Sequence, residues 1–265
     1  MANLGNYPMI FSIIIPTYNC QDSIRRVLSS IANQSFTKKQ FEVICVDDKS
    51  TDSTVKIIKK FKSVRLIQLP RNAGNGRAKN IGVEAAKGEI LFFVDDHIYL
   101  RKDTLKKIYQ IFNTLSNVDG VCGNYKSLKE KDRNVCRDIR RRTIYLKDSK
   151  IRFITCDNFS PFSITIGALR RELFSEHRFP EHFGKDSCED IAFEIQLLNN
   201  NKTFLYSPLI RGYHDHNLSN FGILSKVLTE IRGTGNLIYF LLNNDQKIPF
   251  QYGFLSYPLL ELLRN

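Results

Sequence analysis

The chain contains, at residues 90–97, the stretch Ile90-Leu91-Phe92-Phe93-Val94-Asp95-Asp96-His97, in which five apolar residues run directly into two carboxylates and an imidazole. A short, continuous apolar run is typical of a strand buried on both faces of a parallel sheet. Carboxylates and an imidazole at the end of such a strand suit a divalent cation such as Mg²⁺ or Mn²⁺. A polar turn explains the same tripeptide equally well, so the choice between a metal site and a turn depends on the residues that the fold brings beside it.

The segments around this stretch alternate between the two periodicities of an α/β fold. Apolar runs are followed by helical patterns, such as Ile24, Val27, Leu28 and Ile31 at spacing i, i+3, i+4, i+7. The expected strands are Phe11–Ile15 (ended by Pro16), Phe41–Val46, Val64–Leu69, Ile90–Val94 and Val118–Asn124. Such an alternation predicts an α/β protein with a Rossmann-like, mainly parallel sheet flanked by helices.

Polar residues follow four of these strands. They are Thr17–Asn19, Asp47–Asp48, Asn72–Asn80 and Asp95–His97. The carboxyl ends of parallel strands meet at one edge of the sheet, and ligands of such sheets bind there. The sequence therefore predicts that these four clusters form one binding site.

The composition narrows the class of protein. The 265 residues include 39 Lys and Arg against 27 Asp and Glu, a formal net charge of +12 that favours anionic partners. No apolar run reaches the roughly 18–20 residues of a membrane-spanning helix, and the N-terminus has no signal-peptide pattern. The six scattered cysteines form no CxxC pair, so we expect reduced thiols in a cytoplasmic protein and no zinc site.

The second half of the chain carries three further polar features, each with a plain structural explanation. Glu189 and Asp190 open a helical pattern, where acids complement the helix dipole, yet a carboxylate there also suits a general base. The segment His214-Asp215-His216 offers two imidazoles to a metal, or is a solvated loop. The basic stretch Arg137–Arg142 fits a solvated surface, a phosphate contact or docking on an anionic membrane.

Taken together and in this order, the motifs resemble the catalytic domain of glycosyltransferase family 2, a GT-A fold. The resemblance covers about residues 10–216, and its joint match is specific although each piece alone is weak. It rests on Phe11-Ser12-Ile13-Ile14-Ile15-Pro16-Thr17-Tyr18-Asn19, Val46-Asp47-Asp48-Lys49-Ser50-Thr51-Asp52, Asn72-Ala73-Gly74-Asn75-Gly76-Arg77-Ala78-Lys79-Asn80-Ile81-Gly82, Gly88-Glu89-Ile90-Leu91-Phe92-Phe93-Val94-Asp95-Asp96-His97, Arg170-Arg171-Glu172-Leu173-Phe174 and Cys188-Glu189-Asp190-Ile191-Ala192-Phe193-Glu194.

The resemblance implies transfer of a sugar from a nucleotide-sugar donor to an acceptor hydroxyl, usually with inversion. It implies that Asp190 is the catalytic base, with Glu189 beside it. A divalent metal, Mn²⁺ or Mg²⁺, is implied at Asp95, His97 and His214, with His216 as the second choice for the last. The implied donor-binding residues are Pro16, Thr17, Tyr18, Asn19, Asp47, Asp48, Asn72, Gly74, Lys79, Asp95 and Asp96, of which either Asp47 or Asp48 contacts the nucleotide base.

Two positions depart from the family pattern. His97 stands at the third position of the metal-binding DxD motif, where Asp is usual, so the metal preference can differ. Lys79 stands where Arg is common. A lysine keeps the positive charge but loses the planar fork with which arginine grips a diphosphate.

The division of the chain, its partners and its location are further expectations, drawn from the pattern of the chain together with the resemblance. We expect a catalytic domain over residues 1–216 and a C-terminal helical extension over residues 217–265, which covers the acceptor site, forms a homodimer or docks on a membrane. The acceptor is a saccharide, a lipid-linked sugar or a protein, and UDP is the favoured nucleotide by analogy. No nucleic-acid partner is expected. The expected location is the cytoplasm, either free or peripheral on the inner face of the plasma membrane.

Two other classes of function stay open at this point. A nucleotidyltransferase also combines a Rossmann-like sheet with metal-binding carboxylates. It would be expected to carry a Gly-rich basic loop where this chain has Pro16-Thr17-Tyr18-Asn19. An inactive GT-A homologue acting as a binding module is the other alternative.

Overall fold

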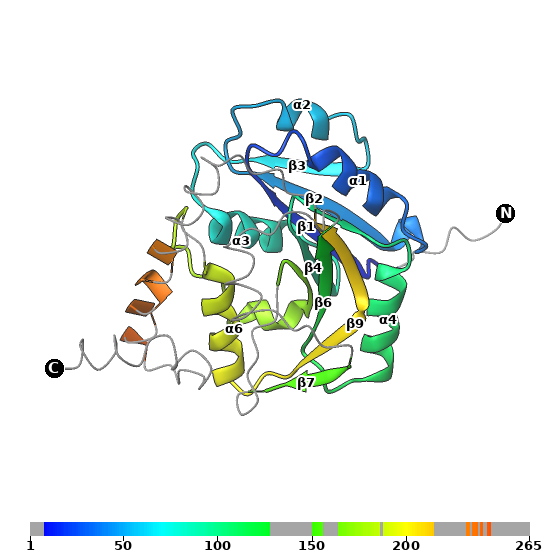
Figure 1. The fold of residues 1–265 in the computed structure, drawn as a ribbon, viewed down its shortest axis with the longest axis vertical. Helices are drawn as coiled ribbons and strands as arrows, with labels where there is room; N and C mark the ends of the chain where they lie inside the picture. Colours follow the sequence, from blue (N-terminus) through cyan, green and yellow to red (C-terminus); the bar gives the residue numbers. More distant parts are fainter. Residues whose placement is uncertain are drawn as a thin grey trace.

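The computed structural model describes residues 8–127, 150–155, 164–185 and 188–214, and the short stretches 232–233, 235–237, 239–240 and 243–244. A central sheet carries helices on both sides (Figure 1). The described strands are β1 Phe11–Thr17, β2 Phe41–Asp47, β3 Val64–Gln68, β4 Ile90–Val94, β5 Ile98–Leu100, β6 Gly120–Ser127, β7 Arg152–Ile154, β8 Ile166–Arg170 and β9 Phe204–His214. The described helices are α1 Ile24–Ala32, α2 Thr54–Ile58, α3 Asn75–Ala85, α4 Thr104–Thr114 and α6 Glu189–Asn199, with 3₁₀ turns at Lys38–Gln40 and Arg171–Ser175.

The sheet has the order β3-β2-β1-β4-β8-β6-β9-β5, with β7 paired to β9. Strands β3, β2, β1 and β4 are parallel neighbours, as the alternation of apolar runs and helical patterns predicts. Strand β8 then lies antiparallel between β4 and β6, whereas β6 and β9 are parallel. The α/β class with flanking helices is confirmed. The sheet is mixed, because β8 pairs antiparallel with β4 and β6, and β9 pairs antiparallel with β5 and β7.

Each face of the sheet has its own apolar core because neighbouring residues of a strand point to opposite faces. In β1, Ile13 and Ile15 pack with the buried residues of α1 and α4, whereas Ile14 packs with those of α3 and α6. The helix face predicted in α1 is confirmed, since Ile24, Val27, Leu28 and Ile31 are its buried residues. In Figure 1, α1 and α4 lie to the right of the sheet and α3 and α6 to the left.

Strand β1 does not end at Pro16, as the sequence suggested, but continues through it to Thr17. The carbonyl of Thr17 accepts the N–H of Asp48, so the backbone polar groups of Thr17 face β2. The nitrogen of Pro16 therefore faces β4, where pairing has already ended at Ile14 and Phe93. A proline is tolerated there because no ladder hydrogen bond is lost.

The described parts of the C-terminal segment are mostly helical and contact the body of the sheet domain. Leu237 is buried in the same apolar core as α6. The ring of Phe240 stacks on His182 with centroids 5.5 Å apart. The expected division at residues 216 and 217 falls outside the described residues. No helix in the described part of the chain is long and apolar enough to span a membrane.

Candidate active site

The candidate site lies where the strand order reverses. Strand β1 has β2 on one side and β4 on the other, and ligands of open α/β sheets bind beyond the carboxyl ends of the strands at such a point. Pairing between β1 and β4 ends at Ile14 and Phe93. Beyond that point the backbone N–H of Tyr18 donates to Asp96 Oδ2 at 3.3 Å, so the segments that follow the two strands meet.

Asn19 joins the segment after β1 to the segment after β2. Its backbone adopts a positive φ of 47°, a conformation that asparagine tolerates better than most residues. The N–H of Asn19 donates to Ser50 Oγ at 2.9 Å, and Asn19 Oδ1 accepts the N–H of Thr51 at 2.8 Å. This reciprocal pair fixes the two loops relative to each other.

Asp47 ends β2 and Asp48 follows it, and the two carboxylates have different environments. The two oxygens of Asp48 accept the N–H groups of Ala73 and Gly74, at 2.7 and 2.8 Å, and so fix the loop after β3. Asp47 Oδ2 accepts the N–H of Ser50, but its buried Oδ1 has no hydrogen-bond partner among the described residues. The buried Oδ1 of Asn72 also lacks one. Unsatisfied buried acceptors are rare in folded proteins, so Asp47 and Asn72 are available to a ligand's donor groups.

Asp95, Asp96 and His97 lie together after β4, each partly exposed. His97 Nδ1 is 3.0 Å from Asp96 Oδ1, and His97 Nε2 is 3.9 Å from Asp95 Oδ2. Two ligands at about 2.1 Å from one ion can be at most roughly 4.2 Å apart, so Asp95 and His97 fit a shared divalent cation. Burial raises the pKa of Asp95, and the positive charges of His97 and Lys79 oppose this. In the described part of the chain, no group of three or more potential ligand residues forms a ready metal site.

His214 ends β9, with its backbone in register with Ile98, one residue after His97. The fold thus brings the third proposed ligand beside the other two. The side chain of His214 lies outside what the structure describes, as do His216 and the basic stretch Arg137–Arg142.

Helix α6 begins with Glu189 and Asp190, immediately after Cys188, which has a positive φ of 83°. Asp190 Oδ1 accepts the N–H of Ile191 at 2.9 Å. Burial, with the negative charges of Glu189 and Asp95, raises the pKa of Asp190 to about 6, while Lys79 opposes the shift. A carboxylate with a pKa near neutrality suits a general base.

Lys79 lies on α3 and is buried against Glu189. The Lys79 Nζ is 2.9 Å from Glu189 Oε1, with side chains only 1% and 6% exposed. Although burial lowers the pKa of Lys79, the carboxylates of Glu189, Asp190 and Asp95 outweigh it and raise that pKa. Lys79 is therefore a buried cation rather than a surface lysine.

A comparison with protein families assigns the chain. The sequence model described as glycosyl transferase family 2 matches residues 12–178. The chain belongs to glycosyltransferase family 2. Similarity to individual members extends further: a poly(ribitol-phosphate) β-glucosyltransferase of Bacillus spizizenii is 34% identical over 195 residues, which cover 71% of this chain and 29% of that protein.

Solved structures of glycosyltransferases share the fold. TarS 1-349 of Staphylococcus aureus in complex with UDP-GlcNAc has a TM-score of 0.70 at 25% identity, covering 95% of this chain and 72% of that one. A mannosyltransferase of Pyrobaculum calidifontis in complex with GDP-Man and Mn²⁺ has a TM-score of 0.67 at 20% identity, covering 93% and 68%. The matched stretches span 18% of the curated full-length TarS and 29% of the Bacillus enzyme, so this chain corresponds to a fraction of their length.

Several residues that hold this family 2 site together were not predicted from the sequence. Asn75 donates to Glu189 Oε1 at 3.0 Å. Asn80 is buried and exchanges hydrogen bonds with the backbone of Phe179, at 2.9 and 3.0 Å. Both lie in the stretch Asn72–Gly82, which was identified only for its contacts to the donor. Nothing in the local sequence signals a partner about 100 residues away.

Proposed function

We propose that the chain transfers a sugar from a UDP-sugar to a hydroxyl of a cell-surface polysaccharide or glycoconjugate, with inversion at the anomeric carbon. Family membership supports glycosyl transfer. The names of the relatives support the donor and the acceptor class, because they include a poly(ribitol-phosphate) transferase and a UDP-GlcNAc complex. A polymer or a lipid-linked sugar is therefore the preferred acceptor over a protein.

One observation carries the proposal. The partly exposed Asp95–His97 cluster and the raised-pKa carboxylate of Asp190 come from different halves of the chain, yet Asp95 is near enough to raise the pKa of Asp190. A site for a departing nucleoside diphosphate and a base for an incoming hydroxyl are thus adjacent. A binding module would need no such base.

The donor is proposed to bind beyond β1, β2 and β4, along Pro16, Thr17, Tyr18, Asn19, Gly74, Asp95 and Asp96. Asp47 Oδ1 and Asn72 Oδ1 are the proposed acceptors for N–H or hydroxyl groups of the nucleoside, because both are buried and unsatisfied. Asp48 is proposed to act indirectly, since both of its oxygens hold the loop that carries Asn72 and Gly74.

Asp95 and His97, with His214, are the proposed ligands of a divalent metal. A metal bound there supplies Lewis-acid stabilisation of the departing diphosphate. Asp190 accepts the proton of the acceptor hydroxyl while that oxygen attacks the anomeric carbon and the bond to the diphosphate breaks. Since Asp190 Oδ1 accepts the N–H of Ile191, we assign the proton to Oδ2.

Location and assembly are proposed as well. The four described cysteines are free thiols, the state expected in the cytoplasm. Peripheral contact with the inner membrane face and a homodimer through the C-terminal segment are the remaining proposals.

A panel of UDP- and GDP-sugars with Mn²⁺ or Mg²⁺ tests the function by release of the nucleotide. We expect UDP release from at least one UDP-sugar, faster with acceptor than without. Binding of UDP without any release would favour the inactive homologue, and pyrophosphate release from a nucleoside triphosphate would favour the nucleotidyltransferase.

A further inference from the structure

Lys79 is the most deeply buried cation next to the candidate site among the described residues. Its ammonium contacts Glu189 Oε1 and lies 5.1 Å from the centroid of the Phe179 ring. Asn75 Nδ2 donates to the same Glu189 oxygen at 3.0 Å. Glu189 is thus held from one side by two residues of α3, one turn apart.

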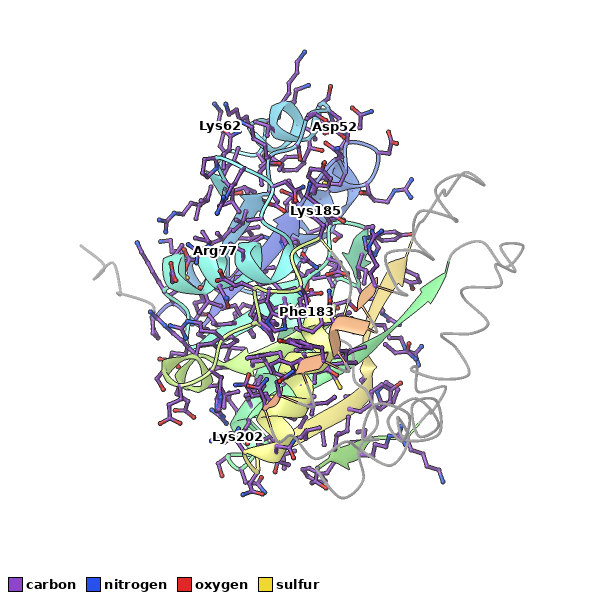
Figure 2. All side chains as sticks on the ribbon, turned by 90° about the vertical axis from the view of Figure 1, so that its left-hand side faces the viewer. Asp52, Lys62, Arg77, Phe183, Lys185 and Lys202 are labelled. Atoms are coloured by element: carbon purple, nitrogen blue, oxygen red, sulfur yellow. The ribbon has the colours of Figure 1, made fainter. Side chains whose placement is uncertain are left out.

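A buried charge pair of this kind is sensitive to the loss of either partner. Removing one member leaves the other charge without compensation in a poorly solvated place, which destabilises the local arrangement strongly. The neighbouring pair between Arg77 and Glu181 differs. Its Nη1 and Oε1 atoms are 3.0 Å apart, but the two side chains are 43% and 40% exposed. Exposed pairs contribute little. Arg77 lies on the face of the molecule that Figure 2 presents, close to the segment that carries Phe183.

The pair also joins the two functional parts of the site. Helix α3 begins directly after Gly74, whose N–H is held by Asp48 at the donor edge. Glu189 is followed directly by Asp190, the proposed base, and α6 starts there out of the left-handed conformation of Cys188. A side chain that fixes Glu189 therefore fixes the first turn of α6, and with it the carboxylate of Asp190.

We propose that Lys79 is a positioning residue that holds Asp190 through Glu189, and not a ligand of the donor diphosphate. The inference rests on the proposed glycosyl transfer. Its geometric basis is that the Lys79 side chain is 1% exposed and its ammonium already contacts Glu189 and the Phe179 ring. A diphosphate would have to displace a buried carboxylate to reach it. If Lys79 does not bind the donor, a lysine in place of the family's usual arginine removes no bidentate contact to the diphosphate.

The test separates binding from turnover in four variants: Lys79→Met, Glu189→Gln, the double variant, and the control Arg77→Met. UDP affinity is measured by calorimetry and kcat by UDP release. We expect Lys79→Met and Glu189→Gln each to lower kcat by about 10- to 100-fold, because a base displaced by about 1 Å loses that much. UDP Kd should stay within about threefold, the sign that ground-state binding is intact.

The double variant measures the coupling. If Lys79 acts only through Glu189, the double variant should lose no more kcat than the worse single variant, because both changes break one unit. It also replaces both charges with neutral side chains of similar length, so it is expected to fold even where Lys79→Met alone does not. The control Arg77→Met should retain wild-type kcat.

Three results would overturn the inference. The first is a UDP affinity that is at least about tenfold weaker in Lys79→Met, or in the double variant, but unchanged in Glu189→Gln. That result would mark Lys79 as a diphosphate ligand. Another is loss of kcat in the double variant equal to the product of the two single losses. A wild-type protein that releases no UDP from any UDP-sugar would overturn both this role and the proposed function, whereas the first two results leave the function standing.

Discussion

Asp47 and Asp48 are neighbours in the chain, but among the described residues only Asp48 has both of its carboxylate oxygens hydrogen-bonded, since Asp47 uses Oδ2 alone. Asp48 accepts two backbone N–H groups of the loop after β3. Asp47 is equally buried, yet its Oδ1 accepts none. We therefore expect Asp48 to act structurally and Asp47 to contact the donor, a choice that the sequence left open.

Matched substitutions at these two positions should therefore give opposite phenotypes. Asp47→Asn should weaken UDP binding by about 10- to 100-fold, because a hydrogen bond to a charged acceptor is lost. It should change the free energy of unfolding by less than about 1 kcal/mol. Asp48→Asn should cost about 1–3 kcal/mol of stability, since one of two N–H donors loses its acceptor. Calorimetry and urea unfolding of both variants would show the contrast, and equal effects at the two positions would contradict it.

The raised pKa of Asp190 predicts a pH dependence at the same scale. The carboxyl must be ionised to accept a proton, and burial together with the nearby carboxylates moves its pKa upward to about 6. We expect kcat at saturating donor to fall about tenfold for each pH unit below that value and to be flat above it. A profile that stays flat down to pH 4 would remove Asp190 as the group that titrates.

At the scale of elements, the strands β1 to β4 could be predicted within one or two residues. Strands β1 and β4 are apolar runs buried along their whole length, whereas β3 is a partly exposed edge strand that still carries three apolar residues. The end of β1 was misjudged, since the sequence does not show that β4 stops pairing before Pro16. Strands β5 and β8 were not predicted. Strand β5 has only three residues, and it is stabilised by register with β9, more than 100 residues away. Contacts of that range, including Lys79 with Glu189, leave no local pattern.

The loop that precedes α3 depends on the close approach of two glycines. Gly74 has a φ of +92°, and an added Cβ would lie 1.6 Å from the carbonyl oxygen of Gly184. Gly184 also has a positive φ, of 56°, but an added Cβ there would have no other atom within 4 Å. Both residues therefore have a positive φ, but only at Gly74 would an added Cβ meet backbone atoms.

We expect Gly74→Ala to cost about 2–4 kcal/mol of stability or to displace the donor loop, because backbone atoms must move. Gly184→Ala should cost only about 1 kcal/mol, the penalty of the left-handed conformation alone. Urea unfolding of both variants measures the difference. A Gly184→Ala variant as unstable as Gly74→Ala would show that strain in the backbone, and not the contact, dominates.

At the scale of the whole molecule, the excess of positive charge is unevenly distributed. Residues 53–83 contain no Asp or Glu. Six cations of this region are exposed and form no ion pair with another described residue: Lys56, Lys59, Lys60, Lys62, Arg65 and Arg71. Of the carboxylates of the site, Asp47, Asp48 and Glu189 are buried, and Asp95, Asp96 and Asp190 are only partly exposed. The net charge of +12 therefore resides largely on the surface, where like charges repel one another.

Salt should consequently stabilise the protein. Raising NaCl from a few millimolar to about 0.3 M shortens the Debye length below the spacing of the surface charges and screens their repulsion. A gain of about 1 kcal/mol corresponds to a rise in Tm of roughly 2–4 °C for a chain of this size. Differential scanning fluorimetry with NaCl measures it. A Tm that falls with salt would mean that exposed ion pairs outweigh the repulsion.

The central claim is that Asp190 deprotonates an acceptor hydroxyl next to a nucleotide bound at the β1–β4 edge. The most direct measurement is the steady-state release of UDP by Asp190→Asn beside the wild type, with the UDP Kd of both. We expect Asp190→Asn to lower kcat by about 10²- to 10⁴-fold, the usual contribution of a general base, and to leave UDP affinity unchanged. Near-normal transfer by Asp190→Asn would contradict it.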